Sequence, residues 1–315
     1  MPGDSLKDLT EVFTRRFLLN ALLPTFVFAA ATATLIVHST AGLPAAAAWW
    51  GRLDALTKIA MALLVAVCTF FLSSAVASQW RGLIRLYEGY PLVGLLGRFQ
   101  RSAPGISAHE ARRARLADTS RAEVTDQYYR YPPEDTDEGP IPVLPTRLGN
   151  ILLAGEYYST DHYKIDCVVF WPRLFPLLPP AFRTNYQAAQ ANAEFPLVVS
   201  FEAAVATVIG ATAVLLGHGA PLLFAGVVLV GAALSYGAYV TALTGATELA
   251  EQQRTAWDLY RDRLLRQWPS VLDVRDEEEA FEHIYGFVVQ GFRPQWDRPH
   301  RRYLRRHPAP PDQGD

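Results

Sequence analysis

Four long apolar runs constrain this chain more than any other feature. They cover residues 17–37, 56–77, 197–216 and 221–243. A helix rises about 1.5 Å per residue, so roughly 20 apolar residues cross the hydrocarbon core of a bilayer. Buried helices of soluble proteins rarely stay so apolar over this length. We therefore predict an all-α integral membrane protein with four transmembrane helices, arranged as two pairs and embedded in a lipid bilayer.

The composition supports this interpretation because the charges are unevenly placed. Half of the residues are hydrophobic and 19% are charged, and the charges gather between the apolar runs. The two cysteines lie apart, Cys68 inside an apolar run and Cys167 in a hydrophilic region. The chain therefore has no disulfide framework in its sequence and no Cys/His cluster with the spacing of a zinc site.

Basic residues flank the runs on one side, which predicts their orientation. The loop at 38–55 holds only Arg52, and the turn at 217–220 holds no Lys or Arg. The basic residues gather instead before the first run, after the second, before the third and after the fourth, at Lys7, Arg15, Arg16, Arg81, Arg85, Arg98, Arg101, Arg173, Arg183, Arg254, Arg261, Arg263 and Arg266. Because loops rich in Lys and Arg stay in the cytoplasm, we expect both termini there.

The first run has an alternative interpretation as a secretory signal. The small residues of AGLPAAAA, just before Trp49, resemble a cleavage region. Against cleavage, the run is longer than a usual signal core and sixteen residues precede it. A mature N-terminus near Trp49, found by mass spectrometry, would remove the first helix.

Two polar residues inside the runs are candidates for a transport pathway. Glu202 is the only acidic residue within a run, and an ionisable group in hydrocarbon needs a reason. It either lines a water-filled path or binds a cation, or else it lies near the cytoplasmic interface, paired with an arginine or wetted there. Asn20 stands one turn before Pro24, where a kink with a polar face is expected.

The fourth run carries a stripe of small side chains. Ala233, Gly237, Thr241 and Gly245 recur every four residues and so share one helix face. Small stripes let helix backbones approach closely, which favours association in lipid. The pattern predicts helix packing and fits contacts within one subunit as well as contacts between subunits.

The region between the second and third runs is too long for a simple connection, at about 120 residues. We predict a mainly helical cytoplasmic region at 78–196, following the first helix pair at 17–77 and the short N-terminal segment 1–16. Residues 80–99 look interfacial. Ser107 and Thr146 are expected to cap helices. A linker at 131–145, which contains five prolines, should extend across the surface.

The rest of the hydrophilic sequence is expected to be helical as well. Residues 163–180 are apolar and aromatic but broken by prolines, so they should insert into the core of the cytoplasmic part or lie against the membrane. A helix from 181 should run directly into the second transmembrane pair at 197–243. A cytoplasmic extension at 244–292 should continue the fourth helix to about Trp268. A last helix, capped by Ser270 or Asp273, should place Phe281 on an apolar face.

The C-terminal tail at 293–315 is rich in arginine and proline and is expected to be disordered. Its arginines are candidates for contact with anionic lipid headgroups, at about 1 kcal/mol each. The candidates are Arg301, Arg302, Arg305 and Arg306.

The sequence carries no signature of catalysis or cofactor binding. Nucleotide-binding loops, glycine-rich dinucleotide motifs, esterase and zinc-protease motifs are all absent from it. Asp161, His162 and Asp166 are weak metal candidates, and their spacing matches no ligand pattern. Acidic residues interleave with the basic ones between 107 and 130, which argues against nucleic-acid binding. We expect no enzyme activity and no cofactor.

Two segments resemble those of a known but uncharacterised family. TRLGNIL at 146–152 and WPRLFPLLP at 171–179 are similar to segments of multi-pass membrane proteins of actinobacteria. The resemblance implies a bacterial cytoplasmic (inner) membrane as the location. It implies no activity and transfers no site residue.

These features leave three functional hypotheses. The first is a homo-oligomer without enzymatic activity, whose subunits enclose an ion or small-solute channel. The second is a membrane anchor or scaffold that recruits a cytoplasmic protein partner through the apolar insert at 168–178 and the tail. The third, a membrane-embedded enzyme, has no residue constellation in its favour.

Overall fold

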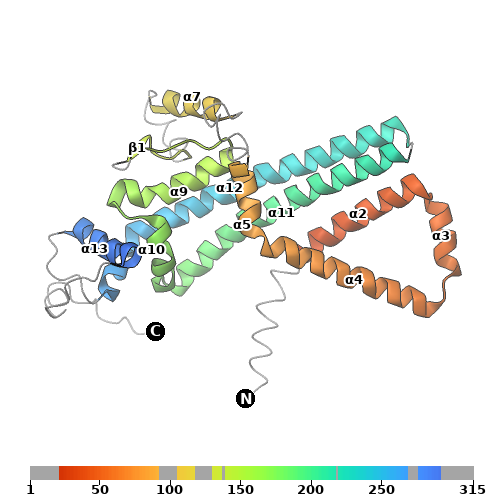
Figure 1. Cartoon of the computed structure of the whole chain (residues 1–315), viewed down its shortest axis with the longest axis horizontal. Helices are drawn as coiled ribbons and strands as arrows, with labels where there is room; N and C mark the ends of the chain where they lie inside the picture. The colour runs from red at the N-terminus through yellow and green to blue at the C-terminus, as the bar shows by residue number, and fades with distance from the viewer. Residues whose placement is uncertain are drawn as a thin grey trace, which may run out of the picture. The chain divides into compact units, whose positions relative to one another are not determined.

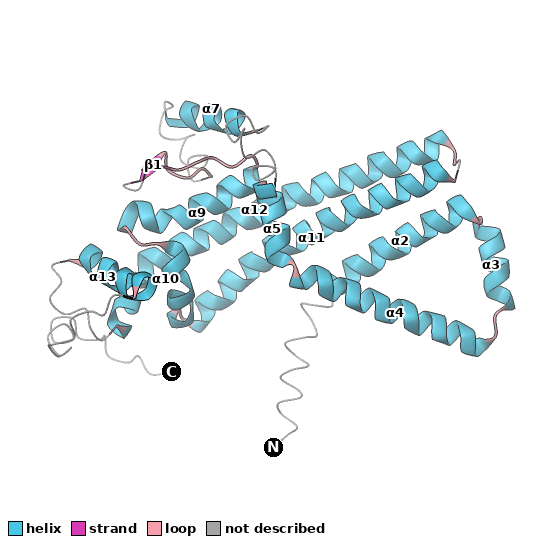
Figure 2. Ribbon diagram, viewed as in Figure 1, coloured by secondary structure: helices cyan, strands magenta, loops and turns pink. Residues whose placement is uncertain are grey.

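The computed structural model describes residues 21–91, 105–117, 130–136, 139–217, 219–268 and 276–291. Helices make up most of this structure (Figure 2). The chain divides into two compact units. The first comprises Met1–Pro91 and Gln190–Gly245, and the second comprises Leu92–Ala189 and Ala246–Asp315.

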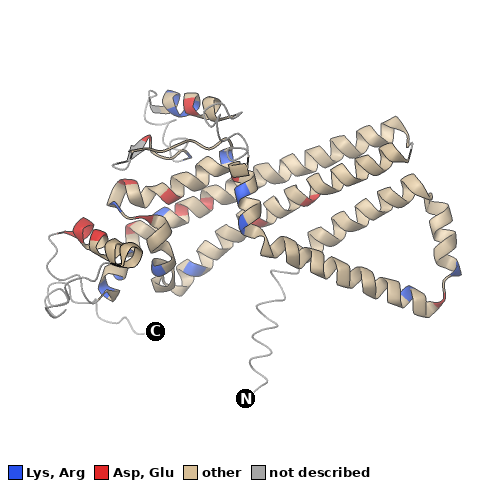
Figure 3. Ribbon diagram, viewed as in Figure 1, with Lys and Arg blue, Asp and Glu red and all other residues tan. Residues whose placement is uncertain are grey.

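Four helices are long and apolar enough to cross a membrane. They are α2 (Leu23–Thr40), α4 (Ala55–Ser78), α11 (Pro180–Leu216) and α12 (Pro221–Gln267). Charged residues are sparse along the apolar parts of these helices (Figure 3). The prediction of an all-α chain with four candidate membrane spans is confirmed to this extent.

Two of these helices extend well beyond their apolar runs. α11 has 37 residues and contains Pro196, and α12 has 47 residues. Within the first unit they lie side by side (Figure 1). The predicted helical lead into the third run and the predicted helix of over forty residues through the fourth are therefore both found.

The segment between α2 and α4, expected as a loop, contains a further helix. α3 (Leu43–Arg52) follows Gly42, whose φ of +79° suits glycine, and it has a proline in its first turn. The helix contains four consecutive alanines, and alanine has the highest helix propensity of all residue types. Asp54 then caps α4 by accepting a hydrogen bond from the Thr57 amide at 2.9 Å.

α5 (Trp80–Glu88) follows α4 directly and ends at Gly89, which adopts a left-handed conformation. Leu83 is buried, whereas Arg81 and Arg85 are exposed. The helix therefore has the two-faced character expected of residues 80–99, of which the structure describes 80–91.

The second unit packs around an aromatic core. α9 (Arg147–Tyr163), α10 (Cys167–Leu174), the single turn η3 (Phe175–Leu177) and α13 (Glu277–Gln290) surround the last part of α12. Trp257 is fully buried, and the rings of Phe170 and Phe281 meet edge to face at 5.1 Å. The apolar insert thus lies in the core, the first of its two predicted placements.

The helix caps agree with the sequence-based predictions at some helix ends and differ from them at others. The Thr146 hydroxyl accepts from the Gly149 amide at 3.0 Å and caps α9, as predicted. α7 (Ile106–Ala117) begins before Ser107, so the prediction that Ser107 caps it is wrong. Asp276 caps α13. The predicted caps Ser270 and Asp273 lie outside the described residues.

The proline-rich linker is more buried than predicted. It contains a short antiparallel pair, β1 (Asp135–Thr136) and β2 (Gly139–Pro140). Ile141 and Val143 are each only 3% exposed. The Asn150 side chain bonds to both the amide and the carbonyl of Leu144, at 2.9 and 2.8 Å. Alternating apolar residues and this amide clamp hold the segment against α9 rather than across the surface.

Candidate intramembrane polar site

A carboxyl group lies inside the bundle of the first unit. Glu202 of α11 is 7% exposed, and its Oε1 accepts a hydrogen bond from the hydroxyl of Thr25 on α2. Its Oε2 is buried and has no hydrogen-bond partner among the described residues. Thr25 is itself buried. This hydrogen bond is one of the contacts between α11 and α2, which also approach each other closely at Gly210 and Leu35.

No described Lys, Arg or His forms an ion pair with Glu202. Pairing with an arginine, one of the two forms of the interfacial interpretation, is thus not found in the described part of the chain, and the other form, wetting at the interface, stays a prediction. Glu202 is the sixth residue of its apolar run at 197–216, and an acidic side chain within a membrane helix costs up to about 3 kcal/mol on insertion scales. Such a cost, without a charged partner to offset it, is typical of a functional group.

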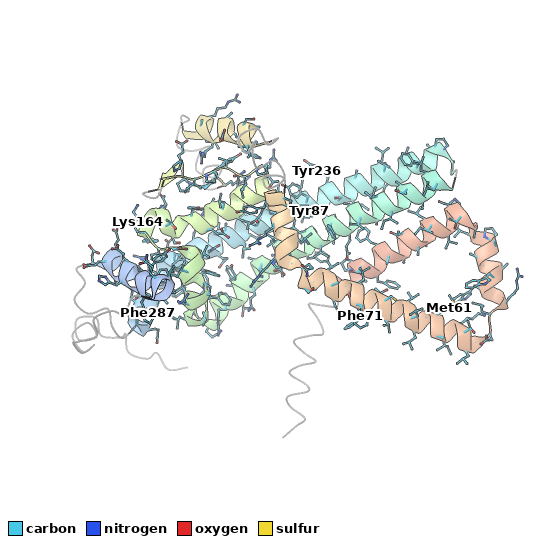
Figure 4. The ribbon with its side chains drawn as sticks, in the orientation of Figure 1. Met61, Phe71, Tyr87, Lys164, Tyr236 and Phe287 are labelled. Atoms are coloured by element: carbon cyan, nitrogen blue, oxygen red, sulfur yellow. The ribbon has the colours of Figure 1, made fainter. Side chains whose placement is uncertain are left out.

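A second set of hydroxyls joins α5, α11 and α12. The Tyr87 hydroxyl donates to Ser200 Oγ at 2.8 Å, and Ser235 Oγ donates to the Ser200 carbonyl at 3.0 Å. The rings of Tyr87 and Tyr239 stack with centroids 5.9 Å apart. Burial raises the pKa of Tyr87 above its ordinary value of 10.0, which keeps the hydroxyl a donor. Tyr87 lies on α5 (Figure 4).

These hydroxyls are separate from the Glu202 site. Ser200 and Glu202 stand two residues apart on α11, and residues at this spacing point to different sides of a helix. Ser200 therefore fastens α5 and α12, while Glu202 faces α2. The sequence singled out Glu202, but its partner Thr25 is 177 residues away and no local pattern links the two.

The other pathway candidate falls outside this geometry. Asn20 lies outside the described residues. Pro24 stands in the first turn of α2, where proline fits a helix, and is buried there. Residues 21 and 22, directly before α2, form a π-helical turn, and Leu22 has helical backbone angles (φ −63°, ψ −45°). The chain is therefore already helical before Pro24, and the kink expected around Asn20 and Pro24 stays a prediction.

The small-residue stripe of α12 is mostly exposed in the single chain. Ala233, Gly237 and Thr241 are exposed, and a Cβ added at Gly237 would meet no atom within 4 Å. At Gly245, by contrast, an added Cβ would lie 2.5 Å from backbone atoms of Asn192 and Ala193. Of the four residues, Gly245 is thus the one at which α12 approaches α11 closely.

The contacts between α11 and α12 follow a neighbouring face instead. A Cβ at Gly231 would collide with the Thr207 side chain, and Ser235 bonds to Ser200. Gly231, Ser235 and Gly245 therefore mark the intramolecular packing line. The stripe predicted from the sequence lies on the neighbouring face of α12, where Ala233, Gly237 and Thr241 are exposed.

The weak metal candidates do not converge. Asp166 caps α10 by accepting from the Val168 amide at 2.8 Å, so its carboxylate serves the helix end. His162 Nδ1 lies 3.2 Å from Asp161 Oδ2, and its ring stacks on Tyr158. No three His, Cys, Asp or Glu side chains gather into a metal site within the part of the chain that the structure describes. The lipid-headgroup candidates Arg301, Arg302, Arg305 and Arg306 lie outside that part.

The second unit has a polar clasp that sequence reasoning missed. The hydroxyls of Tyr158 and Tyr163 on α9 both donate to Asp258 Oδ1 of α12, at 2.9 and 2.7 Å. Arg261 lies 4.0 Å above the Tyr163 ring and also pairs with Glu277 of α13 at 2.8 Å. Burial, and then the bond to Asp258, raise the pKa of Tyr158 above its ordinary value. The clasp joins three helices and has the geometry of a structural tie.

The thiol in this unit is sheltered. Cys167 is 5% exposed, and the side-chain amide of Gln253 donates to its Sγ at 2.9 Å. Burial raises the pKa of the Cys167 thiol to about 12. Because the thiolate is the reactive form, this cysteine is poorly suited to nucleophilic or redox chemistry.

Comparisons of the chain with protein-family models, with curated proteins and with solved structures found no match. The resemblance carried by residues 146–152 and 171–179 stays a prediction. The polar site and the exposed faces of the spans are the features of the chain that bear on its function.

Proposed function

We propose that this chain is a multi-pass protein of the bacterial cytoplasmic membrane that assembles with copies of itself and conducts an ion or small solute. The spans form two pairs, with both termini and the hydrophilic regions in the cytoplasm. The observation that carries this proposal is the Glu202–Thr25 pair. A membrane protein that only anchored a partner would have no need of a buried, uncompensated carboxyl group.

The exposed faces of the spans support assembly. In the most apolar stretch of each helix, only 11% of the residues of α4 and 6% of the residues of α12 are buried. Lipid covers such faces readily, but the open small residues Ala233, Gly237 and Thr241 favour a second helix. Small residues permit close backbone contact, which is a main source of helix association in lipid. A copy of the same chain supplies such a helix.

The scaffold hypothesis has less support. Its contact surfaces were expected at the apolar insert and at the tail, which lies outside the described residues. In the insert, Phe170, Leu174 and Leu178 are instead buried in the core of the second unit. Val168, at 77% exposed, is the large apolar residue of that insert that faces outward. A single exposed valine makes a poor docking site.

The assembly is tested with the purified full chain in nanodiscs. We expect several copies per particle by native mass spectrometry, and fewer copies for Gly237→Leu, because a large side chain there blocks close helix approach. Leu234→Ala is the matched control, since it shortens an exposed apolar side chain on the same helix. A monomer in the wild-type protein would contradict the proposal.

Conduction is tested in planar bilayers with the same preparation. We expect a current that Glu202→Gln reduces at least several-fold, whereas Glu194→Gln leaves it unchanged. Glu194 lies on the same helix, eight residues earlier, and outside the apolar run. Absence of current from assembled wild-type protein, across pH and salt, would overturn the channel and favour the scaffold.

A further inference from the structure

The Glu202 carboxyl has one oxygen that nothing in the described structure satisfies. Thr25 donates to Oε1, whereas Oε2 is buried without a partner. A buried carboxylate requires a cation or a donor at each exposed lone pair, because an unpaired charge in a low-dielectric interior is costly. A cation or a proton at Oε2 removes the unpaired charge, and the question is which of these the site can hold.

Among the described residues, the neighbouring elements do not supply that charge. The other titratable side chains on the packed spans and on α5 are placed elsewhere, and none of them bonds to Glu202 in the described residues. They include the exposed Arg81 and Arg85 together with Tyr87 and Glu88 on α5, His38 on α2, Lys58 and Cys68 on α4, Glu194 on α11, and Tyr236 and Tyr239 on α12. His38 is 13 residues beyond Thr25, or roughly 20 Å along a helix axis.

The small number of side-chain oxygen ligands at this site limits which cation it can bind. Ca²⁺ takes six to eight oxygens and Mg²⁺ an octahedral set, usually from more than one carboxylate or with several waters. Here the side chains offer one carboxyl group and one hydroxyl, and no further acidic residue joins them in the described residues. A proton needs a single oxygen lone pair. It is the cation that this pair can hold without further ligands.

We propose that the Glu202–Thr25 pair is a proton-binding site, at which the Glu202 carboxyl takes up and releases a proton within the bundle. The Thr25 hydroxyl holds Oε1, so Oε2 is the atom that carries the proton. This deepens the proposed function, on which it rests only for the role of the proton as the conducted ion. Proton uptake at Glu202 can be measured whether or not the chain conducts.

The experiment is infrared difference spectroscopy of the full chain in nanodiscs, between acidic and alkaline buffer. A protonated carboxylic acid has a C=O stretch that disappears on ionisation. We expect one such band to be lost in Glu202→Gln and kept in Glu194→Gln. We also expect Thr25→Val to shift it, because the hydrogen bond to Oε1 is then absent. A difference spectrum identical in wild type and Glu202→Gln would overturn the proposal.

Labelling with a lipid-soluble carbodiimide gives an independent readout. This reagent reacts with protonated carboxyl groups in apolar surroundings, and peptide mass spectrometry locates the adduct. We expect labelling at Glu202 that falls as pH rises and that Na⁺, K⁺ or Ca²⁺ does not suppress. Suppression by one of these metal ions at constant pH would replace the proton with that ion. A labelled wild type without conductance would refute the proposed channel and leave the proton site intact.

Discussion

The close approach of α12 to α11 at Gly245 predicts a sharp difference between two glycine substitutions. In Gly245→Ala the new Cβ would lie 2.5 Å from backbone atoms of Asn192 and Ala193, where ordinary contact begins at 3.4 Å. The two helices would therefore have to separate by 3.4 − 2.5 = 0.9 Å at that point. Backbone has no rotamer to yield, so we expect a loss of about 1–3 kcal/mol in the free energy of unfolding.

Gly226→Ala is the matched control on the same helix, at a position outside the small-residue stripe that we propose packs against a second copy. Its Cβ would meet nothing within 4 Å, so the substitution removes only the conformational freedom of glycine. We expect a gain of up to about 0.5–1 kcal/mol. The measurement is unfolding in mixed micelles at increasing sodium dodecyl sulfate, followed by circular dichroism and by the native oligomer band. Equal stability of the two variants would refute the assignment of the packing line to Gly231, Ser235 and Gly245.

Further predictions concern the second unit. With Cys68 replaced by alanine, Cys167 should react slowly with a water-soluble maleimide near neutral pH and faster as pH rises or the protein unfolds; fast labelling of the folded protein would contradict its burial. Because burial raises the pKa of Cys167 from 9.0 to about 12, its contribution to stability should be full below 9.0 and lost as pH rises toward 12, and Cys167→Ser should flatten that loss. In a denaturant titration, Asp258→Asn should lower the free energy of unfolding by about 1–2 kcal/mol, because two tyrosine hydroxyls lose a charged acceptor. The control Asp262→Asn breaks one exposed ion pair with Arg266 and should lower it by less than about 0.5 kcal/mol. Thr146→Ala should cost about 1 kcal/mol through loss of the α9 cap, and no change in that titration would argue against the cap.

The apolar runs made the four candidate spans predictable. The extension of α12 followed from the one-sided apolar stripe of Leu249, Ala256, Tyr260 and Leu264. Hydropathy and the periodicity of apolar residues depend on local sequence, so they can be assessed without knowledge of the fold. Thr146 was found as a cap for the same reason, because the signal lies within four residues. α3 was missed although its alanine run and early proline favour a helix.

Features that depend on tertiary contact were less accessible. Residues 233, 237 and 241 have the spacing of a packing face, but the sequence cannot tell which face of an apolar helix meets a neighbour of the same chain. The burial of Ile141 and Val143 was masked by the prolines and acidic residues around them. The partner of Glu202 could not be found from sequence because a hydrogen bond between α2 and α11 leaves no periodic signature.

The central claim is that Glu202 lies on or beside the path of a conducted ion. The most direct test is the reversal potential of the wild-type current and of the residual Glu202→Gln current, under opposed gradients of protons and of potassium chloride. We expect the wild-type reversal potential to follow the proton gradient, and the variant to lose that dependence while forming the same oligomer. A reversal potential that Glu202→Gln leaves unchanged would contradict the account.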